Sequence, residues 1–359
     1  MEDLVERGMR NLLADDLDRV LEQTAGLWED LRGGRVLLTG GTGFFGCWLL
    51  ESLLWANERF GLGASAVVLT RDARAFSGKA PHIASSPAVA LHQGDVRTFT
   101  WTGGALSHVV HAGTDTQVPR TRDDRLRVFD TIVEGTRRTL DIAERAGAAR
   151  FLMTSTGAVY GRQPAAVTHV SEDFGGSPDA TCPRHAGAEA KRAAEMLCAV
   201  YAEGPLHTTV ARCFAFVGPY LPLDGHLAIG TFIGAALERR AIRIAGDGTP
   251  LRSYMYAADL TTWLWTILLR GGRGQAYNVG SEHAISIAEV ARAVARIAGT
   301  GSEVIIAGEP AGGPSERYVP ATQRARTDLG VRMTVDFEEA LARTLDWHRG
   351  RGGSNHGAS

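Results

Sequence analysis

Three glycines near the N-terminus have a spacing that suits a nucleotide cofactor. They lie in the segment Gly40-Gly41-Thr42-Gly43-Phe44-Phe45-Gly46, which follows a short apolar run and precedes a longer amphipathic one. Between a strand and a helix, the first glycine permits the turn, the second lets the backbone approach a pyrophosphate, and the third allows close packing. The segment therefore predicts a dinucleotide-binding loop, with cofactor contacts from Gly40, Thr42, Gly43, Phe44, Phe45 and Gly46.

Two further segments follow the next apolar runs and predict contacts to the adenosine half of that cofactor. A site that prefers NAD usually has a carboxylate after the second strand, whereas an arginine there can bind the 2′-phosphate of NADP. This chain has Thr70 at that point and then Arg71. The sequence thus predicts NAD or NADP, with a slight preference for NADP, although Asp72 could serve NAD if the loop ran two residues longer. After the third strand, Asp95 and Val96 are expected to bracket the adenine, with Asp95 accepting from its amino group.

Alternating strands and helices must position these loops. Apolar runs predict strands over 35–39, 66–70, 108–112, 151–155 and 207–214, and amphipathic runs predict helices over 43–60, 129–146 and 186–203. Apolar strands between such helices predict an α/β fold, a doubly wound parallel sheet of the Rossmann type with helices on both faces. We expect an N-terminal helical extension over 1–33, the dinucleotide-binding domain over 34–215, a smaller mixed C-terminal substrate lobe over 216–348, interleaved with the sheet, and a disordered tail over 349–359.

Composition and charge exclude several classes of protein. The chain has 359 residues, a formal net charge of −2 and 22% charged residues, so neither nucleic acid nor an anionic membrane is an expected partner. Its four cysteines have neither zinc-binding nor disulfide-framework spacing, and we expect no metal. The N-terminus lacks a signal-peptide pattern, and the longest apolar stretch, Thr261 to Leu269, covers about half a membrane span. The sequence predicts a soluble cytoplasmic protein.

The motifs along the chain resemble those of the extended short-chain dehydrogenase/reductase family, in its nucleotide-sugar epimerase/dehydratase branch. The resemblance covers roughly residues 34–345. It is carried by the glycine loop, Gly94-Asp95-Val96, His111-Ala112-Gly113, Thr154 to Gly161, Lys191, Arg212 to Pro219, Gly246 to Tyr254, Tyr277 to Gly280 and Arg317-Tyr318. It implies a tightly held nicotinamide cofactor that takes hydride from a sugar carbon, usually carbon 4, of a nucleoside-diphosphate sugar.

The resemblance also implies roles for individual residues. Thr156 would hydrogen-bond the reacting oxygen, and Lys191 would bind the nicotinamide ribose and lower the pKa of a base. Arg252 is the first choice for the sugar-nucleotide diphosphate and Arg317 the second, while the loop Leu221 to His226 would border the sugar. The implied cofactor contacts include Ala112, Gly113, Thr154 and Lys191, and the implied substrate contacts are Thr114, Thr156, Arg252 and Arg317.

The chain departs from the family pattern at one catalytic position. The family's general base is a tyrosine four residues before the lysine, on the same face of the helix, and here that residue is Gly187. Three explanations remain open. A substitute side chain transfers the proton, with His185 nearest and Cys182, Tyr160 and Tyr220 in neighbouring segments; the substrate or a water transfers it; or the protein only binds its ligands.

The residues after Thr156 bear on the reaction type. Family members that dehydrate or decarboxylate typically have an acidic residue within the next two positions, whereas this chain has Gly157 and Ala158. This argues against 4,6-dehydration and favours epimerisation or ketone reduction, with 4,6-dehydration and non-redox ligand binding kept as alternatives. The family's dimers commonly use two helices per subunit, which match Leu126 to Ala146 and Ala186 to Glu203, so a homodimer is expected.

Overall fold

The structure is a computed structural model that describes residues 11–114, 119–225, 227–309 and 312–352. Its central feature is a seven-stranded sheet in the order β11-β6-β5-β4-β1-β2-β3, and each neighbouring pair is parallel. These strands are β1 (Arg35–Thr39), β2 (Ser65–Thr70), β3 (Val89–Gln93), β4 (His108–His111), β5 (Arg150–Thr156), β6 (His207–Cys213) and β11 (Ala276–Val279). The fold class predicted from the sequence is confirmed.

The strand order reverses between β1 and β4, and this is the point where such a sheet binds ligands. From β1 the chain moves outward through β2 and β3, then returns to β4 on the other side of β1 and continues through β5 and β6. Loops at the carboxyl ends of β1 and β4 therefore leave the sheet in opposite directions and open a crevice.

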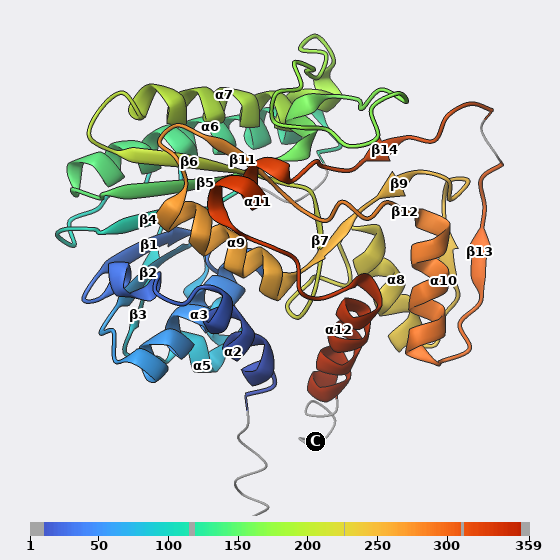
Figure 1. Ribbon diagram of the computed structural model, residues 1–359, viewed down its shortest axis with the longest axis horizontal. Helices are drawn as coiled ribbons and strands as arrows, with labels where there is room; N and C mark the ends of the chain where they lie inside the picture. Colours follow the sequence, from blue (N-terminus) through green and yellow to red (C-terminus); the bar gives the residue numbers. More distant parts are fainter. Residues whose placement is uncertain (1–10, 115–118, 226, 310–311, 353–359) are drawn as a thin grey trace, which may run out of the picture.

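Helices cover both faces of the sheet (Figure 1). On one face α6 (Arg122–Arg145) and α7 (Ala186–Tyr201) lie side by side, and their apolar residues join the sheet in one core cluster. The other face packs against α3 (Phe44–Phe60) and α9 (Ala257–Arg270), where Trp263 and Trp265 are fully buried. Shorter helices lie near the β2–β3 edge and beside β11, namely α4 (Ala73–Lys79), α5 (Pro81–Ala84) and α11 (Gln323–Leu329).

The N-terminal extension packs on the second face. It consists of α2 (Ala14–Gln23) and the short helix η2 (Trp28–Leu31), and Leu17 and Val20 of α2 are fully buried. The Asp16 carboxylate accepts a 2.6 Å hydrogen bond from the Tyr256 hydroxyl and pairs with Arg343. These contacts tie the extension to the C-terminal half of the same chain.

The C-terminal lobe combines short strands with three helices. The strands are β7 (Ala215–Val217), β8 (Ile242–Ile244), β9 (Leu251–Arg252), β10 (Tyr254–Tyr256), β12 (Ile285–Ser286), β13 (Val304–Ile306) and β14 (Arg317–Tyr318), and the helices are α8 (Ala228–Leu237), α10 (Ile287–Ala298) and α12 (Phe337–Gly352). They form the pairs β10–β7 and β13–β8 and the three-stranded sheet β12-β9-β14. Between the elements of this lobe, α9 packs on the main sheet and β11 pairs with β6, so the chain passes between the two parts more than once.

Most predicted boundaries lie within two residues of those observed, but the start of α6 and the extent of the C-terminal helix differ more. Helix α6 begins at Arg122 rather than Phe129, because Thr121 and Asp124 form a capping box ahead of the apolar positions. Helix α12 continues to Gly352, so residues 349–352 of the expected disordered tail are helical, and 353–359 lie outside the described residues.

The described ranges contain no helix long and apolar enough to span a membrane. Within the same ranges, His, Cys, Asp and Glu form no group suited to a metal ion. All four cysteines, Cys47, Cys182, Cys198 and Cys213, are free thiols.

Candidate active site

The glycine loop lies in the crevice between β1 and β4, and its shape depends on the absence of side chains. Gly40 has φ +70°, and a Cβ there would come within 2.4 Å of the Ala112 carbonyl oxygen. A Cβ on Gly46 would lie 2.3 Å from the Gly41 Cα. These positions therefore hold the loop against β4 and the first turn of α3 against the loop.

The start of α3 is suited to an anionic group. Gly43 is the N-cap and offers no side-chain cap, so N–H groups of the first turn remain available for a pyrophosphate. A Cβ on Gly43 would meet one atom within 4 Å, the Gly40 carbonyl oxygen at 3.3 Å, so the space beside the loop is open. The Phe45 ring packs edge-on against Phe216 of the C-terminal lobe, so the expected contact from Phe45 to a cofactor would come from its backbone. The residues fit a dinucleotide.

A lysine borders the loop, a feature that the sequence reasoning missed. Lys79 of α4 donates a 2.8 Å hydrogen bond to the Thr42 carbonyl oxygen. The chain has two lysines, Lys79 and Lys191, and each donates to the backbone of a predicted cofactor contact, Thr42 and Thr154 respectively. In the sequence alone, Lys79 looks like an ordinary surface lysine. Only conservation of its positive charge in related chains could have marked it as part of the site.

The residues predicted for the adenosine half lie at the ends of β2 and β3. Thr70 is buried, and its Oγ1 accepts from the Asp72 N–H. The Asp72 carboxylate caps α4 by accepting from the Ala75 N–H, whereas Arg71 is exposed. The Asp95 carboxylate is bound by Arg97, whose hydrogen bonds lower the pKa of Asp95 to about 2.

Val96 and the end of β4 complete the cofactor side. Val96 packs so closely on α6 that a Cβ on Gly135 would lie 2.9 Å from its Cγ1. The Gly113 N–H donates to Thr39 Oγ1, which also lies 2.8 Å from Nδ1 of the buried His111. Burial lowers the pKa of His111 to about 3, so its ring is neutral and connects Thr39 of β1 to Thr136 of α6 by hydrogen bonds. Thr114 ends this described segment, since 115–118 lie outside it.

Lys191 is buried on α7 and points to β5. Its Nζ donates a 2.7 Å hydrogen bond to the Thr154 carbonyl oxygen. Burial lowers the pKa of Lys191 to about 8. The ammonium group therefore lies against the backbone of Thr154 at the carboxyl end of β5, and Thr156 is two residues further along the strand.

Thr156 makes two hydrogen bonds through Oγ1. The Ala158 N–H donates to it over 3.2 Å, and the Tyr318 hydroxyl of β14 lies 3.1 Å away. The Tyr318 ring packs on Phe214, with ring centroids 4.7 Å apart. The C-terminal lobe therefore brings a second hydroxyl to Thr156, although the sequence analysis treated Tyr318 only as part of a motif.

Gly187 leaves open space in the first turns of α7. A Cβ there would meet one atom within 4 Å, Val128 Cγ1 at 3.6 Å, which is an ordinary contact. His185 precedes the helix, and its Nδ1 lies 3.1 Å from the backbone N of Asp179. Its role in proton transfer stays a prediction.

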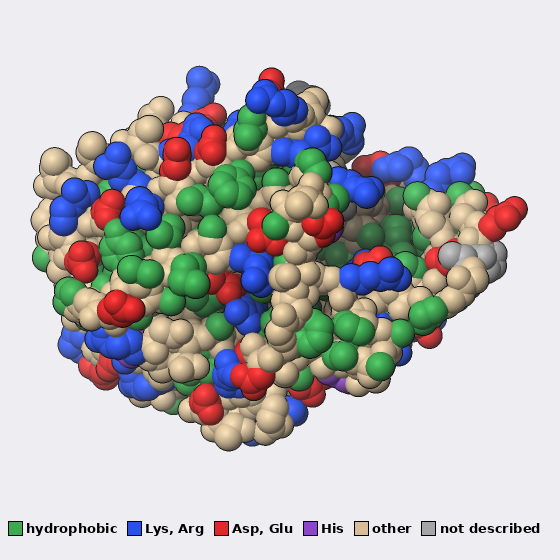
Figure 2. Space-filling view, turned by 90° about the horizontal axis from the view of Figure 1, so that it is seen from above, with side chains coloured by type: hydrophobic (Ala, Val, Ile, Leu, Met, Phe, Trp, Pro, Cys, Tyr) green, Lys and Arg blue, Asp and Glu red, His purple; other side chains and the backbone are tan. Residues whose placement is uncertain are grey.

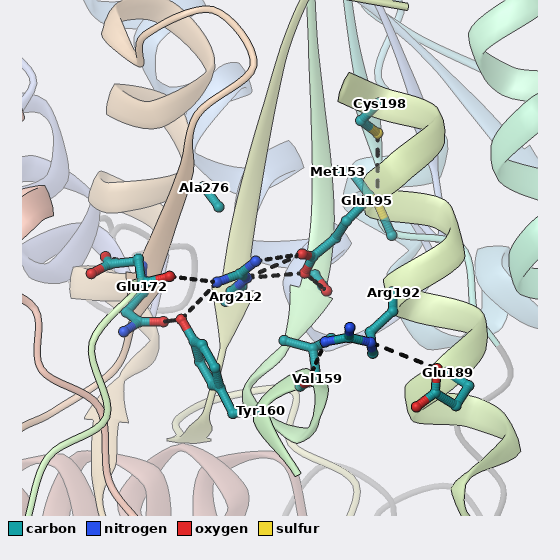
Figure 3. Close-up of polar contacts among 12 residues, drawn as sticks. Met153, Val159, Tyr160, Glu172, Glu189, Arg192, Glu195, Cys198, Arg212 and Ala276 are labelled. Carbon is teal, nitrogen blue, oxygen red and sulfur yellow. Dashed lines mark hydrogen bonds and ion pairs between the residues drawn. The ribbon is translucent and has the colours of Figure 1, made fainter. Parts of the chain in front are cut away.

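A partly buried charged network joins β5, β6 and α7 (Figure 3). The Arg212 guanidinium donates to the Glu195 carboxylate at 2.7 Å and to the Tyr160 hydroxyl at 2.9 Å. Glu195 also accepts a 2.5 Å hydrogen bond from Ser155, the residue before Thr156. The Tyr160 hydroxyl donates to Asn278 and its ring is buried, so Tyr160 is part of this framework.

The candidate substrate residues lie on the short sheet β12-β9-β14. Arg252 donates to the Glu316 carboxylate at 3.0 Å, and its guanidinium lies over the Tyr318 ring. Arg317 pairs with Leu251 in the same sheet and is half-buried. Figure 2 shows the surface hollowed between the larger part of the molecule and the C-terminal lobe, with hydrophobic side chains inside and Lys and Arg at the rim.

The other residues considered for the sugar side are placed differently. Tyr220 is buried with its hydroxyl on the Glu51 carboxylate of α3, at 2.5 Å, so it is not a substitute base. Cys182 is half-buried just before η4 (Pro183–His185). His226 lies outside the described residues.

A broad depression of about 1220 Å³ lies elsewhere, between α10 and the start of α12. Across it, Arg296 pairs with Glu338 at 2.6 Å. None of the predicted site residues lines it. The crevice at the carboxyl ends of β1, β4 and β5 is therefore the better candidate site.

Comparison with known proteins gives consistent matches over most of the chain. The sequence profile of the NAD dependent epimerase/dehydratase family matches residues 36–280. UDP-glucuronic acid decarboxylase 1 of Xenopus tropicalis is 28% identical over 317 residues, which is 88% of this chain and 72% of that protein. The dTDP-glucose 4,6-dehydratase of Streptomyces antibioticus is 26% identical over 320 residues, 88% of this chain and 92% of that protein. The crystal structure of UDP-glucose 4-epimerase from Thermotoga maritima superposes with a TM-score of 0.76 at 22% identity, covering 88% of this chain and 99% of that one.

Proposed function

Because the chain belongs to the NAD-dependent epimerase/dehydratase family, we propose that it is an enzyme acting on a nucleoside-diphosphate sugar. The reaction is epimerisation or reduction at a sugar carbon, with carbon 4 as the expected position. The bound nicotinamide cofactor supplies the acceptor or donor of hydride. The observation that carries the proposal lies at the carboxyl end of β5, where Lys191 Nζ donates to the Thr154 carbonyl oxygen and Thr156 Oγ1, two residues on, contacts the Tyr318 hydroxyl.

The protein's own groups divide the work as follows. The N–H groups at the start of α3 bind the pyrophosphate of the cofactor, and Lys191 places a positive charge at its ribose. The Thr156 hydroxyl hydrogen-bonds the reacting sugar oxygen. Arg252 and Arg317 bind the diphosphate of the sugar nucleotide, since a guanidinium matches phosphate oxygens in a bidentate manner.

Steric crowding at Gly157 supports epimerisation or reduction over 4,6-dehydration. A Cβ on Gly157 would lie 2.6 Å from the ring of Phe214, which is itself buried and packed on Tyr318. An acidic side chain therefore does not fit at this position without displacing the ring. Ala158 offers no acid either, so the second proton transfer of a dehydration lacks its usual group.

The empty position at Gly187 supports a second candidate, a protein that binds cofactor and nucleotide sugar without redox turnover. We rank it below the enzyme because Lys191 is buried and bonded to Thr154 at the end of β5, and Thr156 follows two residues later in the same strand. Mass spectrometry of the cofactor released on denaturation, followed by nicotinamide absorbance with a panel of UDP-, dTDP- and GDP-sugars, separates the two. We expect an absorbance change with at least one sugar; tight sugar binding by calorimetry without any change would favour the binding protein.

The preference for NADP over NAD is the finer part of the cofactor proposal. Arg71 is exposed after β2, while Asp72 is engaged as the cap of α4, which weakens the alternative that Asp72 serves NAD. Lys79 adds a second positive charge at the glycine loop. Both features favour an extra phosphate on the adenosine ribose.

The proposed assembly is a homodimer through α6 and α7. Large apolar side chains are exposed on these two helices, namely Leu126, Phe129, Met196 and Val200, with Met196 65% exposed. In Figure 1 the helices lie side by side on the outer face of the sheet, where a second copy can pack against both. The free thiols are consistent with the reducing cytoplasm as its location.

A further inference from the structure

With its two hydrogen bonds in the structure, the Thr156 hydroxyl can still either donate to a substrate or accept from one. A hydroxyl has one hydrogen and two lone pairs. The Ala158 N–H can only donate, so it occupies one lone pair of Thr156 Oγ1 at 3.2 Å. The Tyr318 hydroxyl, 3.1 Å away, can either donate to the second lone pair of Thr156 Oγ1 or accept its hydrogen.

Tyr318 has a second acceptor within reach. Its hydroxyl lies 3.4 Å from the carbonyl oxygen of Cys213, and the ring is held in place by Phe214. When Tyr318 donates to Thr156, both lone pairs of Oγ1 are used and the threonine hydrogen is free for the substrate. When Tyr318 donates to Cys213, Thr156 donates to Tyr318 and keeps one lone pair for the substrate.

These two states match the two forms of a sugar carbon in a redox reaction. A sugar hydroxyl needs an acceptor, whereas a keto oxygen needs a donor. Burial raises the pKa of Tyr318 to about 12, so the phenol keeps its hydrogen at neutral pH. It is therefore available as a donor in both states.

We propose that Tyr318 is a positioning residue that switches Thr156 between hydrogen-bond acceptor and donor toward the reacting sugar oxygen. The switch rotates two hydroxyl hydrogens and moves no proton between Thr156 and Tyr318; when the sugar hydroxyl is oxidised, the hydride goes to the nicotinamide and the hydroxyl proton goes to a water, and the reverse step takes both back. It rests on the proposed redox function. It also gives the C-terminal lobe a direct part in the chemistry, because the phenol comes from β14, 162 residues after Thr156 in the sequence.

The test is single-turnover nicotinamide absorbance with Tyr318→Phe, which keeps the ring packing on Phe214. Tyr201→Phe is the matched control, because that hydroxyl bonds Asp141 on the α6–α7 face. We expect Tyr318→Phe to slow the step by about 10- to 100-fold with the dissociation constant of the sugar nucleotide little changed. Thr156→Val should be slow as well, and the double variant no slower than the slower single one. Rates of Tyr318→Phe equal to the control, or losses that multiply in the double variant, would overturn the switch.

A second measurement does not depend on turnover. A urea denaturation of the protein without added ligands gives the midpoint shift of each variant. The shifts of Thr156→Val and Tyr318→Phe should not add in the double variant, because both substitutions remove the same hydrogen bond between the two residues. Additive shifts contradict the contact and so the switch. A wild type inert with every nucleotide sugar would overturn the proposed function and the switch together, whereas an active wild type with an unaffected Tyr318→Phe overturns the switch alone.

Discussion

Lys191 Nζ donates a 2.7 Å hydrogen bond to the carbonyl oxygen of Thr154, which joins the middle of α7 to the last residues of β5. The lysine is 6% exposed. A buried ammonium without a carboxylate on it is costly for the folded chain. Lys191 therefore lowers the free energy of unfolding, and in return it places a positive charge at the end of β5.

This relationship predicts a pH-dependent stability. Burial lowers the pKa of Lys191 from 10.5 to about 8, so between these pH values the unfolded chain binds more protons than the folded chain and stability rises with pH. Below pH 8 the lysine is protonated in both states and the full cost of burial is present. Lys191→Met should thus be more stable than wild type at pH 7, by roughly 1–3 kcal/mol, and this advantage should shrink from pH 8 to pH 10.5.

Urea denaturation of both proteins across this pH range checks the prediction. Lys79→Met is the control, because Lys79 is the chain's other lysine and is only half-buried. An advantage of Lys191→Met that stays constant with pH would show that the lysine is not the titrating group.

Arg212 should be important for stability because it is the centre of the network in Figure 3, where the side chains of Arg212 and Glu195 are only 18% and 13% exposed. Removing one partner of a buried ion pair leaves the other charge unpaired, and this typically costs about 3–5 kcal/mol. We expect Arg212→Met to lose an amount of this order in urea denaturation. Arg240→Met, which breaks an exposed pair with Glu238, should lose less than about 1 kcal/mol. Equal losses would contradict the framework role of Arg212.

The local parts of the site could be predicted from the sequence. The glycine loop was found because strand, turn and helix follow one another directly, and Gly40 and Gly46 are required by close backbone contacts. Lys191 was found by its place in a family motif. The start of α6 was placed too late, because its first turn is polar and only the capping box marks it.

The distant parts could not be predicted. Tyr318 reaches Thr156, and Arg212 reaches Glu195 and Tyr160, through tertiary packing that no local pattern specifies. A buried arginine on a strand looks the same in sequence as a solvated one. Likewise, the crowding of Gly157 by Phe214 becomes visible only when β6 lies beside β5.

Arg71 should decide the cofactor preference. Reversing its charge with Arg71→Asp removes a partner for the 2′-phosphate and adds a carboxylate for the ribose hydroxyls. By calorimetry we expect NADP binding to weaken at least about 10-fold while NAD binding is kept or improved. Arg74→Asp on the exposed side of α4 is the control for net charge. Equal weakening by the two variants would remove Arg71 from the site.

Gly187→Tyr tests whether a phenol fits at the vacant position. Among the described residues, a Cβ at position 187 would meet Val128 Cγ1 at 3.6 Å, an ordinary contact, and replacing a helix glycine gains about 0.5–1 kcal/mol in helix propensity. We expect the variant to fold and to speed single-turnover nicotinamide reduction by at least about 10-fold relative to Gly187→Ala, since general-base assistance is worth about 10²–10⁴-fold. A folded variant no faster than Gly187→Ala would mean that the site does not use a phenol there.

The most direct test of the central claim is single-turnover nicotinamide absorbance of wild type, Lys191→Ala and Thr156→Ala across a broad nucleotide-sugar panel. The proposed enzyme predicts an absorbance change in wild type with at least one sugar, slowed about 100-fold or more in each variant. Three proteins that are indistinguishable and inert with every sugar would contradict it and leave a protein that only binds its ligands.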